Sequence, residues 1–322
     1  MESAFQRLAA ELSKLSQVEP VRLQDDSTFV SGERTIDGSA LELEVAWANN
    51  EVFSGGMARD FMVACLKSTT LRWMQSGAAG FDHPVFAKLV DNGVMLSNSH
   101  ATAVPIAEFV LAALLDHFNP QAPRRELQQE GRWGRVRFRE VSGSTWLIVG
   151  MGHIGSEVAT RARAFGATVV GVRRSPRGDE PADRMITPDQ IAAELPSADV
   201  VLLALPANAQ SEHMVDAAFL GAMAPRSALV NVGRGSLVDE AALLAALDVG
   251  TPACAILDVF ETEPLPADSP LWKHPSVHLS AHDAPNSDGL TARNDRVLLD
   301  NLARYVVGER PQGVVDASAV KG

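Results

Sequence analysis

The feature that most constrains the fold is a glycine-rich turn near the middle of the chain, where Gly150, Gly152 and Gly155 form the pattern GxGxxG. The apolar residues 146–149 precede it and predict a buried strand, and the apolar face of residues 154–165 predicts a helix. Such glycines permit a tight turn, close approach of a diphosphate and close packing of helix on strand. The first N–H groups of the helix then bind the anion. Between a strand and a helix, the pattern predicts a dinucleotide site.

Strand-like and helical segments alternate on both sides of this turn. In the second half we predict strands at 145–149, 168–172, 200–205, 228–232, 255–259 and 277–279, with helices that include 154–165 and 239–247. In the first half we predict strands at 41–47, 71–74 and 94–97 and a helix from about 103. The polar segment 119–143 looks like a crossing between domains, and the amphipathic helix 290–307 is expected to return to the first domain. The fold class is α/β, with two Rossmann-like domains and doubly wound parallel sheets.

Composition excludes several classes of protein. A formal net charge of −12 argues against a nucleic-acid binder, which needs a surplus of Lys and Arg. No apolar run is long enough to span a membrane, and the first residues do not resemble a signal peptide. Cys65 and Cys254 are far apart and form no CxxC pair, so we expect two reduced, buried thiols, no metal and a cytoplasmic location.

The end of the second strand in the dinucleotide unit carries Arg173, Arg174 and Ser175, beginning 18 residues after Gly155. A site specific for NAD has Asp or Glu near this position, bound to the ribose 2′-hydroxyl. Arginine instead pairs with a 2′-phosphate through two charged hydrogen bonds. We therefore expect NADP(H) to be preferred, with NAD(H) possible; the alternative is two exposed loop arginines.

Three later segments follow predicted strands and lie where ligands bind in open parallel sheets. They span residues 231–235, 258–264 and 279–282, and they contribute Arg234, Glu263 and His282. Arg234 is suited to bind a substrate carboxylate or polarise a carbonyl, and His282 is suited to deliver a proton to the carbonyl oxygen. Glu263 beside His282 would raise the imidazole pKa and fix its tautomer. These groups match the reduction of a 2-oxo acid.

The order of these motifs resembles that of the D-isomer-specific 2-hydroxyacid dehydrogenases. GxGxxG is followed by NVGRGSLVDE at 231–240, DVFETEPLP at 258–266 and a histidine at a strand end. In the first half, SGAAGFD at 76–82 resembles the family's substrate-carboxylate loop, and VPIAE at 104–108 resembles its interdomain helix. The resemblance covers nearly the whole chain, and the two long motifs are its specific signals.

The resemblance implies roles for individual residues. Arg234, Glu263 and His282 would form the catalytic triad, and Asp258 would contact the nicotinamide carboxamide. The substrate would be bound by Ala78, Ala79, Gly80, Arg234 and His282. The cofactor would be bound by Gly150, Gly152, His153, Ile154, Gly155, Arg173, Arg174, Ser175, Leu205, Pro206, Val232 and Asp258.

The resemblance also implies an architecture and a homodimer. Residues 1–118 and 285–322 would form a discontinuous substrate-binding (catalytic) domain, and residues 119–284 the dinucleotide-binding domain. The active site would lie in the cleft between them, closing on the substrate. One departure is Asp283, where the family has a small apolar residue. Its carboxylate either raises the pKa of His282 further, repels an anionic substrate or points outward.

We therefore expect NADPH-dependent reduction of a small 2-oxo acid, of the glyoxylate or hydroxypyruvate type, to the D-2-hydroxy acid with His282 as general acid. The partners are the small acid and a second copy of the chain, without nucleic acid or membrane. Two alternatives stay open. One is an NAD-linked dehydrogenase acting on a bulkier hydroxy acid, and the other is a dinucleotide-sensing binding protein.

Overall fold

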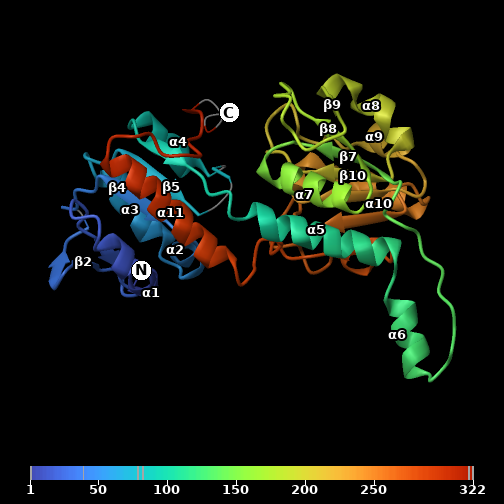
Figure 1. Ribbon diagram of the computed structural model, residues 1–322, viewed down its shortest axis with the longest axis horizontal. Coiled ribbons are helices and arrows are strands. Elements are labelled where there is room, and N and C mark those ends of the chain that lie inside the picture. The colour runs from blue at the N-terminus through green and yellow to red at the C-terminus, as the bar shows by residue number, and fades with distance from the viewer. Residues whose placement is uncertain (1, 39, 78–79, 82, 318–319, 321–322) are drawn as a thin grey trace. The chain divides into compact units, whose positions relative to one another are not determined.

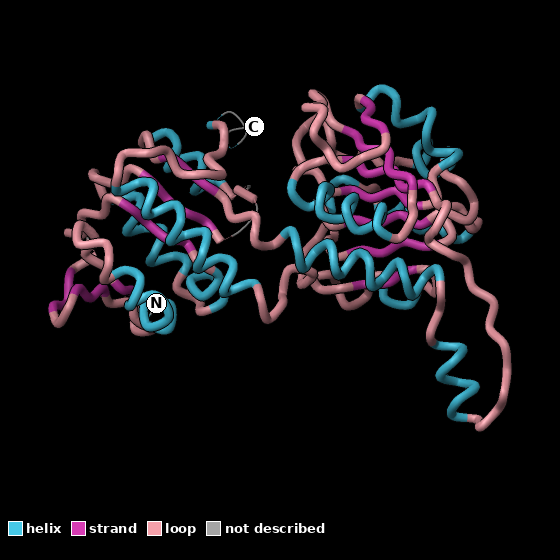
Figure 2. The backbone as a smooth tube through the Cα atoms, in the orientation of Figure 1, coloured by secondary structure: helices cyan, strands magenta, loops and turns pink. Residues whose placement is uncertain are grey.

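The computed structural model describes residues 2–38, 40–77, 80–81, 83–317 and 320, and the structural statements below concern these residues. The chain forms two compact units (Figures 1 and 2). One comprises Met1–Thr102 with Asp288–Gly322, and the other comprises Ala103–Ser287. The last segment of the chain therefore returns to the unit that contains the first.

A seven-stranded parallel sheet forms the centre of the second unit, in the order β13-β12-β11-β10-β7-β8-β9. The strands are β7 (Thr145–Val149), β8 (Thr168–Val172), β9 (Arg184–Ile186), β10 (Val200–Leu203), β11 (Ala228–Asn231), β12 (Cys254–Leu257) and β13 (Val277–Leu279). The predicted doubly wound sheet is confirmed, with the strand order reversing between β7 and β10. Ligands of such sheets bind at this reversal, outside the carboxyl ends of the strands.

Both faces of this sheet are buried because successive strand side chains point to opposite faces. In β7, Trp146 and Ile148 belong to one hydrophobic cluster, and Leu147 and Val149 belong to the other. The helices of this unit are α5 (Ala103–Phe118), α6 (Ala122–Gln129), α7 (His153–Ala164), α8 (Ile191–Glu194), α9 (Ala217–Ala222) and α10 (Glu240–Asp248). Short 3₁₀ turns occur at Pro188–Gln190, Leu195–Ser197, Gly235–Leu237 and Pro270–Lys273.

The helix α5 groups with the second unit, whereas the boundary predicted from the sequence falls after residue 118. The reason is its packing. Its buried residues Ile106, Val110 and Leu114 share a hydrophobic cluster with Val158 and Ala162 of α7. By contrast, α6 has no buried residue and extends away from the rest of this unit (Figure 1).

The first unit contains a parallel sheet of β4 (Val45–Ala48), β5 (Trp73–Ser76) and β6 (Met95–Ser97). A small antiparallel sheet of β1 (Arg22–Leu23), β2 (Phe29–Ser31) and β3 (Arg34–Ile36) was not predicted. The helices are α1 (Glu2–Leu12), α2 (Asn50–Ser54), α3 (Ala58–Lys67), α4 (Pro84–Asp91) and α11 (Leu290–Val306).

The final helix α11 is fixed to the first unit by specific contacts. Asn301 Nδ2 donates a hydrogen bond to Gln75 Oε1 at 2.8 Å. The ring of Tyr305 stacks on that of Trp73, with centroids 5.3 Å apart. Within the described residues, none of the helices is both long and apolar enough to cross a membrane. Nor does this part of the chain contain a group of three His, Cys, Asp or Glu side chains placed to bind a metal.

The two cysteines are free and buried, one in α3 and one in β12. Burial raises the pKa of each thiol, Cys65 and Cys254, to about 12. Because the thiolate is the reactive form, we expect a thiol reagent to modify neither cysteine in the native protein and both in denaturant. Timed labelling followed by mass spectrometry measures this, and rapid modification of the native protein would contradict it.

Candidate active site

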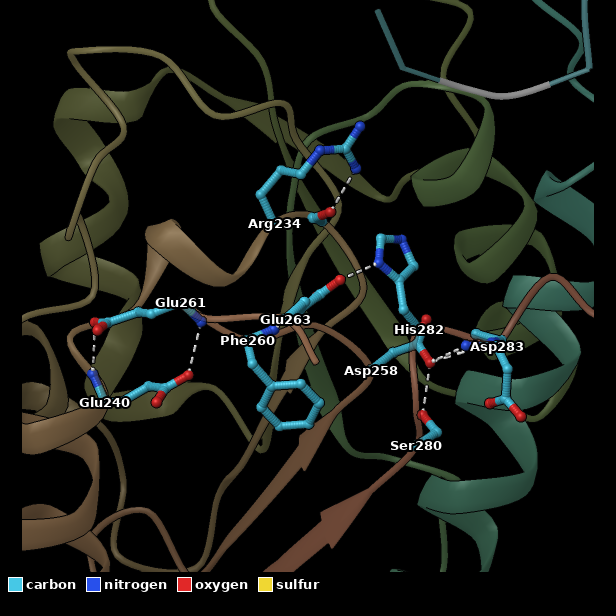
Figure 3. Close-up of polar contacts among 11 residues, drawn as sticks. Arg234, Glu240, Asp258, Phe260, Glu261, Glu263, Ser280, His282 and Asp283 are labelled. Carbon is cyan, nitrogen blue, oxygen red and sulfur yellow. Dashed lines mark hydrogen bonds and ion pairs between the residues drawn. The ribbon is translucent and has the colours of Figure 1, made fainter. Parts of the chain in front are cut away.

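Three loops meet at the carboxyl edge of the second unit's sheet, after β11, β12 and β13 (Figure 3). The strands are adjacent and parallel, and their last paired residues, Asn231, Leu257 and Leu279, are in register. The loops that follow therefore begin at the same height. They carry Arg234, Glu263 and His282.

His282 and Glu263 form a hydrogen-bonded pair, with Nδ1 of the imidazole 2.7 Å from Oε2 of the carboxylate. An ionised carboxylate only accepts hydrogen bonds, so Nδ1 carries the proton and Nε2 is the nitrogen left for proton exchange. The other carboxylate oxygen accepts a hydrogen bond from the Phe260 backbone N–H at 3.0 Å. The imidazole is 48% exposed, so it is reached from solvent while its orientation is fixed.

Asp258 fixes the loop that carries the histidine. Its buried Oδ1 accepts hydrogen bonds from the Ser280 hydroxyl at 2.7 Å and from the N–H groups of Asp283 and Ala284 at 3.0 and 3.1 Å. The His282 N–H donates to the Asp258 carbonyl at 2.8 Å. His282 has φ +53°, in the left-handed region that is unfavourable for side chains other than glycine. The four bonds maintain this backbone conformation.

The orientation of Asp283 selects among the alternatives left open by the sequence. Its side chain is exposed, and its carboxylate points away from the imidazole of His282 (Figure 3). Only its backbone N–H takes part in the site, through Asp258. The outward-pointing alternative is the one observed.

The loop after β11 presents Arg234. Asn231 holds the loop at both ends, because its Oδ1 accepts from Gly233 N at 3.0 Å and its Nδ2 donates to Arg234 O at 2.9 Å. The guanidinium donates from Nη1 to the Gly233 carbonyl at 2.7 Å. In Figure 3 it extends to the same side of the loops as the imidazole of His282.

Gly235 brings the arginine loop against the loop after β12. A Cβ at this position would lie 1.8 Å from the carbonyl carbon of Phe260, so only glycine fits. Reciprocal hydrogen bonds tie the same loops further along: Glu240 N–H donates to Glu261 Oε1 at 3.1 Å, and Glu261 N–H donates to Glu240 Oε1 at 2.8 Å. The arginine and the glutamate are thus held on one rigid platform.

The glycine-rich turn has the geometry that a diphosphate requires. Gly150 has φ +106°, and a Cβ there would lie 2.4 Å from the Ala204 carbonyl oxygen. A Cβ on Gly155 would lie 2.1 Å from the Gly150 carbonyl oxygen. Gly152 caps α7 with no side-chain hydrogen bond, and nothing lies within 4 Å of where its Cβ would be. The positive N-terminal end of α7 therefore faces open space at Gly152. This arrangement suits the binding of a dinucleotide's diphosphate.

The other proposed cofactor residues lie along the same edge. Leu205 and Pro206 follow β10, beside β7 at the reversal of strand order, and Val232 is buried just after β11. His153 and Ile154 are the first two residues of α7.

Arg173 follows β8 and turns toward the glycine-rich turn. Its Nη1 donates to the Met151 carbonyl at 3.3 Å and lies 3.5 Å from Glu180 Oε1. Arg174 and Ser175 are exposed. Burial lowers the pKa of His153, and the charges of Arg177 and Arg173 lower that pKa further. Arg177 and Glu180 were not predicted as site residues, although the charged run after Arg174 is a signal for them.

The proposed substrate-binding residues of the first unit are described only in part. Ala78 and Ala79 lie outside the described residues, and Gly80 is half-buried, shortly after β5. Asp258, proposed as a nicotinamide contact, uses Oδ1 to hold the histidine loop.

Comparison with known proteins adds independent findings. The family model of the D-isomer-specific 2-hydroxyacid dehydrogenase NAD-binding domain matches residues 111–284. A glyoxylate reductase of Korarchaeum cryptofilum is 32% identical over 259 residues, which cover 78% of this chain and 78% of that protein.

Two solved structures share the two-domain architecture. The D-isomer-specific 2-hydroxyacid dehydrogenase from Xanthobacter autotrophicus Py2, in complex with NADPH and MES, is 26% identical with a TM-score of 0.71, covering 88% of this chain and 87% of that one. The NADPH-dependent glyoxylate/hydroxypyruvate reductase from Sinorhizobium meliloti, in complex with NADP and sulfate, is 25% identical with a TM-score of 0.70, covering 90% and 92%.

The parallel sheet with its reversed strand order and the glycine-rich turn are features of a dinucleotide-binding domain, in agreement with the description of the matched family model. The resemblance inferred from the motifs is confirmed by a family model that spans more than half of the sequence. This chain belongs to the D-isomer-specific 2-hydroxyacid dehydrogenase family.

Proposed function

We propose that this chain is an NADPH-preferring reductase of small 2-oxo acids, of the glyoxylate or hydroxypyruvate type, that forms the D-2-hydroxy acid. Its family makes it an NAD(P)-dependent oxidoreductase. The observation that carries the proposal is the 2.7 Å pair of His282 and Glu263 at the sheet edge that also bears the dinucleotide turn. A proton donor and a hydride donor are the two groups that carbonyl reduction needs.

The residues act on the carbonyl group in complementary ways. A nicotinamide held at this edge would supply the hydride that the carbonyl carbon accepts. His282, protonated on both nitrogens, gives the Nε2 proton to the carbonyl oxygen, which becomes the hydroxyl. Glu263 stabilises the imidazolium before transfer and keeps the proton of Nδ1 in place. Arg234 binds the substrate carboxylate or polarises the carbonyl, because its guanidinium is charged throughout.

The cofactor preference is supported by charge at the end of β8. Arg173 lies against the glycine-rich turn and is followed by Arg174, where a site for NAD has an acidic residue. The solved relatives from Xanthobacter autotrophicus and Sinorhizobium meliloti contain NADPH and NADP. The proposal includes a homodimer, which the family resemblance supports. It also includes a cytoplasmic location, which the two free thiols support.

An absorbance assay of NADPH and NADH oxidation tests the whole proposal with glyoxylate, hydroxypyruvate, pyruvate and phenylpyruvate. We expect kcat/KM at least about tenfold higher with NADPH than with NADH, since a charged hydrogen bond to the 2′-phosphate contributes on the order of 1.5 kcal/mol or more. Turnover should be fastest with the two smallest polar acids. A preference for NADH and phenylpyruvate would favour the NAD-linked alternative, and binding without any turnover would favour a dinucleotide-sensing protein.

Removing the proton donor should abolish most of the turnover. His282→Gln is expected to lower kcat by about 10³-fold, because general acid catalysis contributes on the order of 10²–10⁴-fold. Glu263→Gln should lower kcat by about 10–100-fold, since the imidazole of His282 loses the carboxylate that fixes its orientation. Asp268→Asn removes the charge of an exposed carboxylate five residues further along the chain and serves as the control. Full activity of His282→Gln, with NADPH binding intact, would refute the assignment.

Asp258 should be required for a stable histidine loop. Asp258→Ala leaves the three donors on Oδ1 without their acceptor, and we expect the free energy of unfolding to fall by about 2 kcal/mol together with kcat. Denaturant unfolding measures the first effect. Asp283→Asn, which alters only an outward carboxylate on the same loop, should change neither. Equal stability of Asp258→Ala and the wild type would contradict this role.

A further inference from the structure

The segment between β8 and β9 folds back so that Glu180 lies against Arg173. Glu180 Oε1 accepts a hydrogen bond from the Arg177 N–H at 2.9 Å, and Oε2 accepts one from the Gly178 N–H at 2.9 Å. Arg173 Nη1 is 3.5 Å from Oε1. The Glu180 side chain is only 3% exposed. Two consecutive N–H groups and a guanidinium thus form an anion site that is filled by a carboxylate of the chain itself.

The position of this anion site relates it to the cofactor. Arg173 directly follows β8, and its Nη1 is bonded to the Met151 carbonyl of the glycine-rich turn. In a dinucleotide-binding sheet the residue at this place meets the 2′-position of the adenosine ribose. The carboxylate of Glu180 therefore lies on the guanidinium that a 2′-phosphate would use.

The carboxylate is ionised at neutral pH. The N–H group of Arg177 holds the pKa of Glu180 below its ordinary value, and the N–H group of Gly178 and the charge of Arg173 lower that pKa further against the opposing effect of burial. A 2′-phosphate that approaches Arg173 thus meets a negative charge already bound there. The 2′-hydroxyl of NADH carries no charge and meets no such repulsion.

We propose that Glu180 is a specificity-determining residue that competes with the cofactor's 2′-phosphate for Arg173 and so limits the preference for NADPH over NADH. This inference rests on the proposed use of NADPH. Binding of a 2′-phosphate requires Glu180 to leave Arg173 or to share it at close range with a second anion. Removal of the carboxylate charge should therefore strengthen the binding of 2′-phosphorylated nucleotides and leave other nucleotides unaffected.

Nucleotide titration by calorimetry tests this without catalysis. The probes are adenosine 2′,5′-bisphosphate and adenosine 5′-monophosphate, followed by NADPH and NADH. Glu180→Gln keeps the size of the side chain and removes its charge, and we expect Kd for the bisphosphate and NADPH to fall about tenfold, as one close charge pair allows. Kd for the monophosphate and NADH should change less than about twofold.

Two further variants isolate the contact with Arg173. Asp179→Asn makes the same change of charge on the neighbouring, exposed carboxylate and should leave all four Kd values unchanged. In Arg173→Ala with Glu180→Gln the gain should disappear, because the shared guanidinium is gone. If the glutamine variant does not fold, Glu180→Ala removes the same charge in a second way. Binding of adenosine 5′-monophosphate shows whether each variant is folded.

Three results would overturn the inference: unchanged bisphosphate binding in both Glu180 variants, weaker binding in both, or an equal gain in Asp179→Asn. Weaker binding would make Glu180 a positioning residue of the loop. The proposed function is judged separately, from the wild-type ratio of NADPH to NADH affinity in the same titrations. A wild type that prefers NADH, with a tenfold gain in Glu180→Gln, would refute the proposed preference and support the role of Glu180.

Discussion

The carboxylate of Glu263 is the contact on which the rest of the site depends. One oxygen binds the imidazole of His282, and the other binds the backbone N–H of Phe260, three residues earlier in its own loop. The first bond sets the tautomer and direction of the imidazole, and the second fixes the carboxylate that does so. Through these two bonds of Glu263, the conformation of its loop determines the orientation of the imidazole of His282.

Backbone packing and side-chain hydrogen bonds together keep this arrangement in place. The main chain at Gly235 touches that of Phe260 so closely that no side chain fits, and the histidine loop is bonded to Asp258 in the segment after β12. All three loops thus meet at the segment that also carries Glu263. Several hydrogen bonds offset the unfavourable φ of His282, as is typical of strained residues at functional sites.

The motifs predicted the central sheet well because strong alternation of apolar strands and helices leaves few other topologies. β9 was missed since its residues, Arg184–Ile186, begin with a charge and are too few to show a pattern. The grouping of α5 with the second unit could not be predicted, because an apolar pattern indicates that a helix is buried but not which core it packs against. The direction of Asp283 and the contact between Glu180 and Arg173 depend on loop conformation, which no periodicity encodes.

The division of the chain has a consequence for how such proteins diversify. Every described residue assigned here to the transfer of hydride or proton lies between Ala103 and Ser287. The stretch that the family model matches, residues 111–284, lies inside the same unit. The dinucleotide turn and the paired imidazole and carboxylate are therefore encoded in one continuous stretch of the gene, and an exchange of either end of the gene would pass them on together.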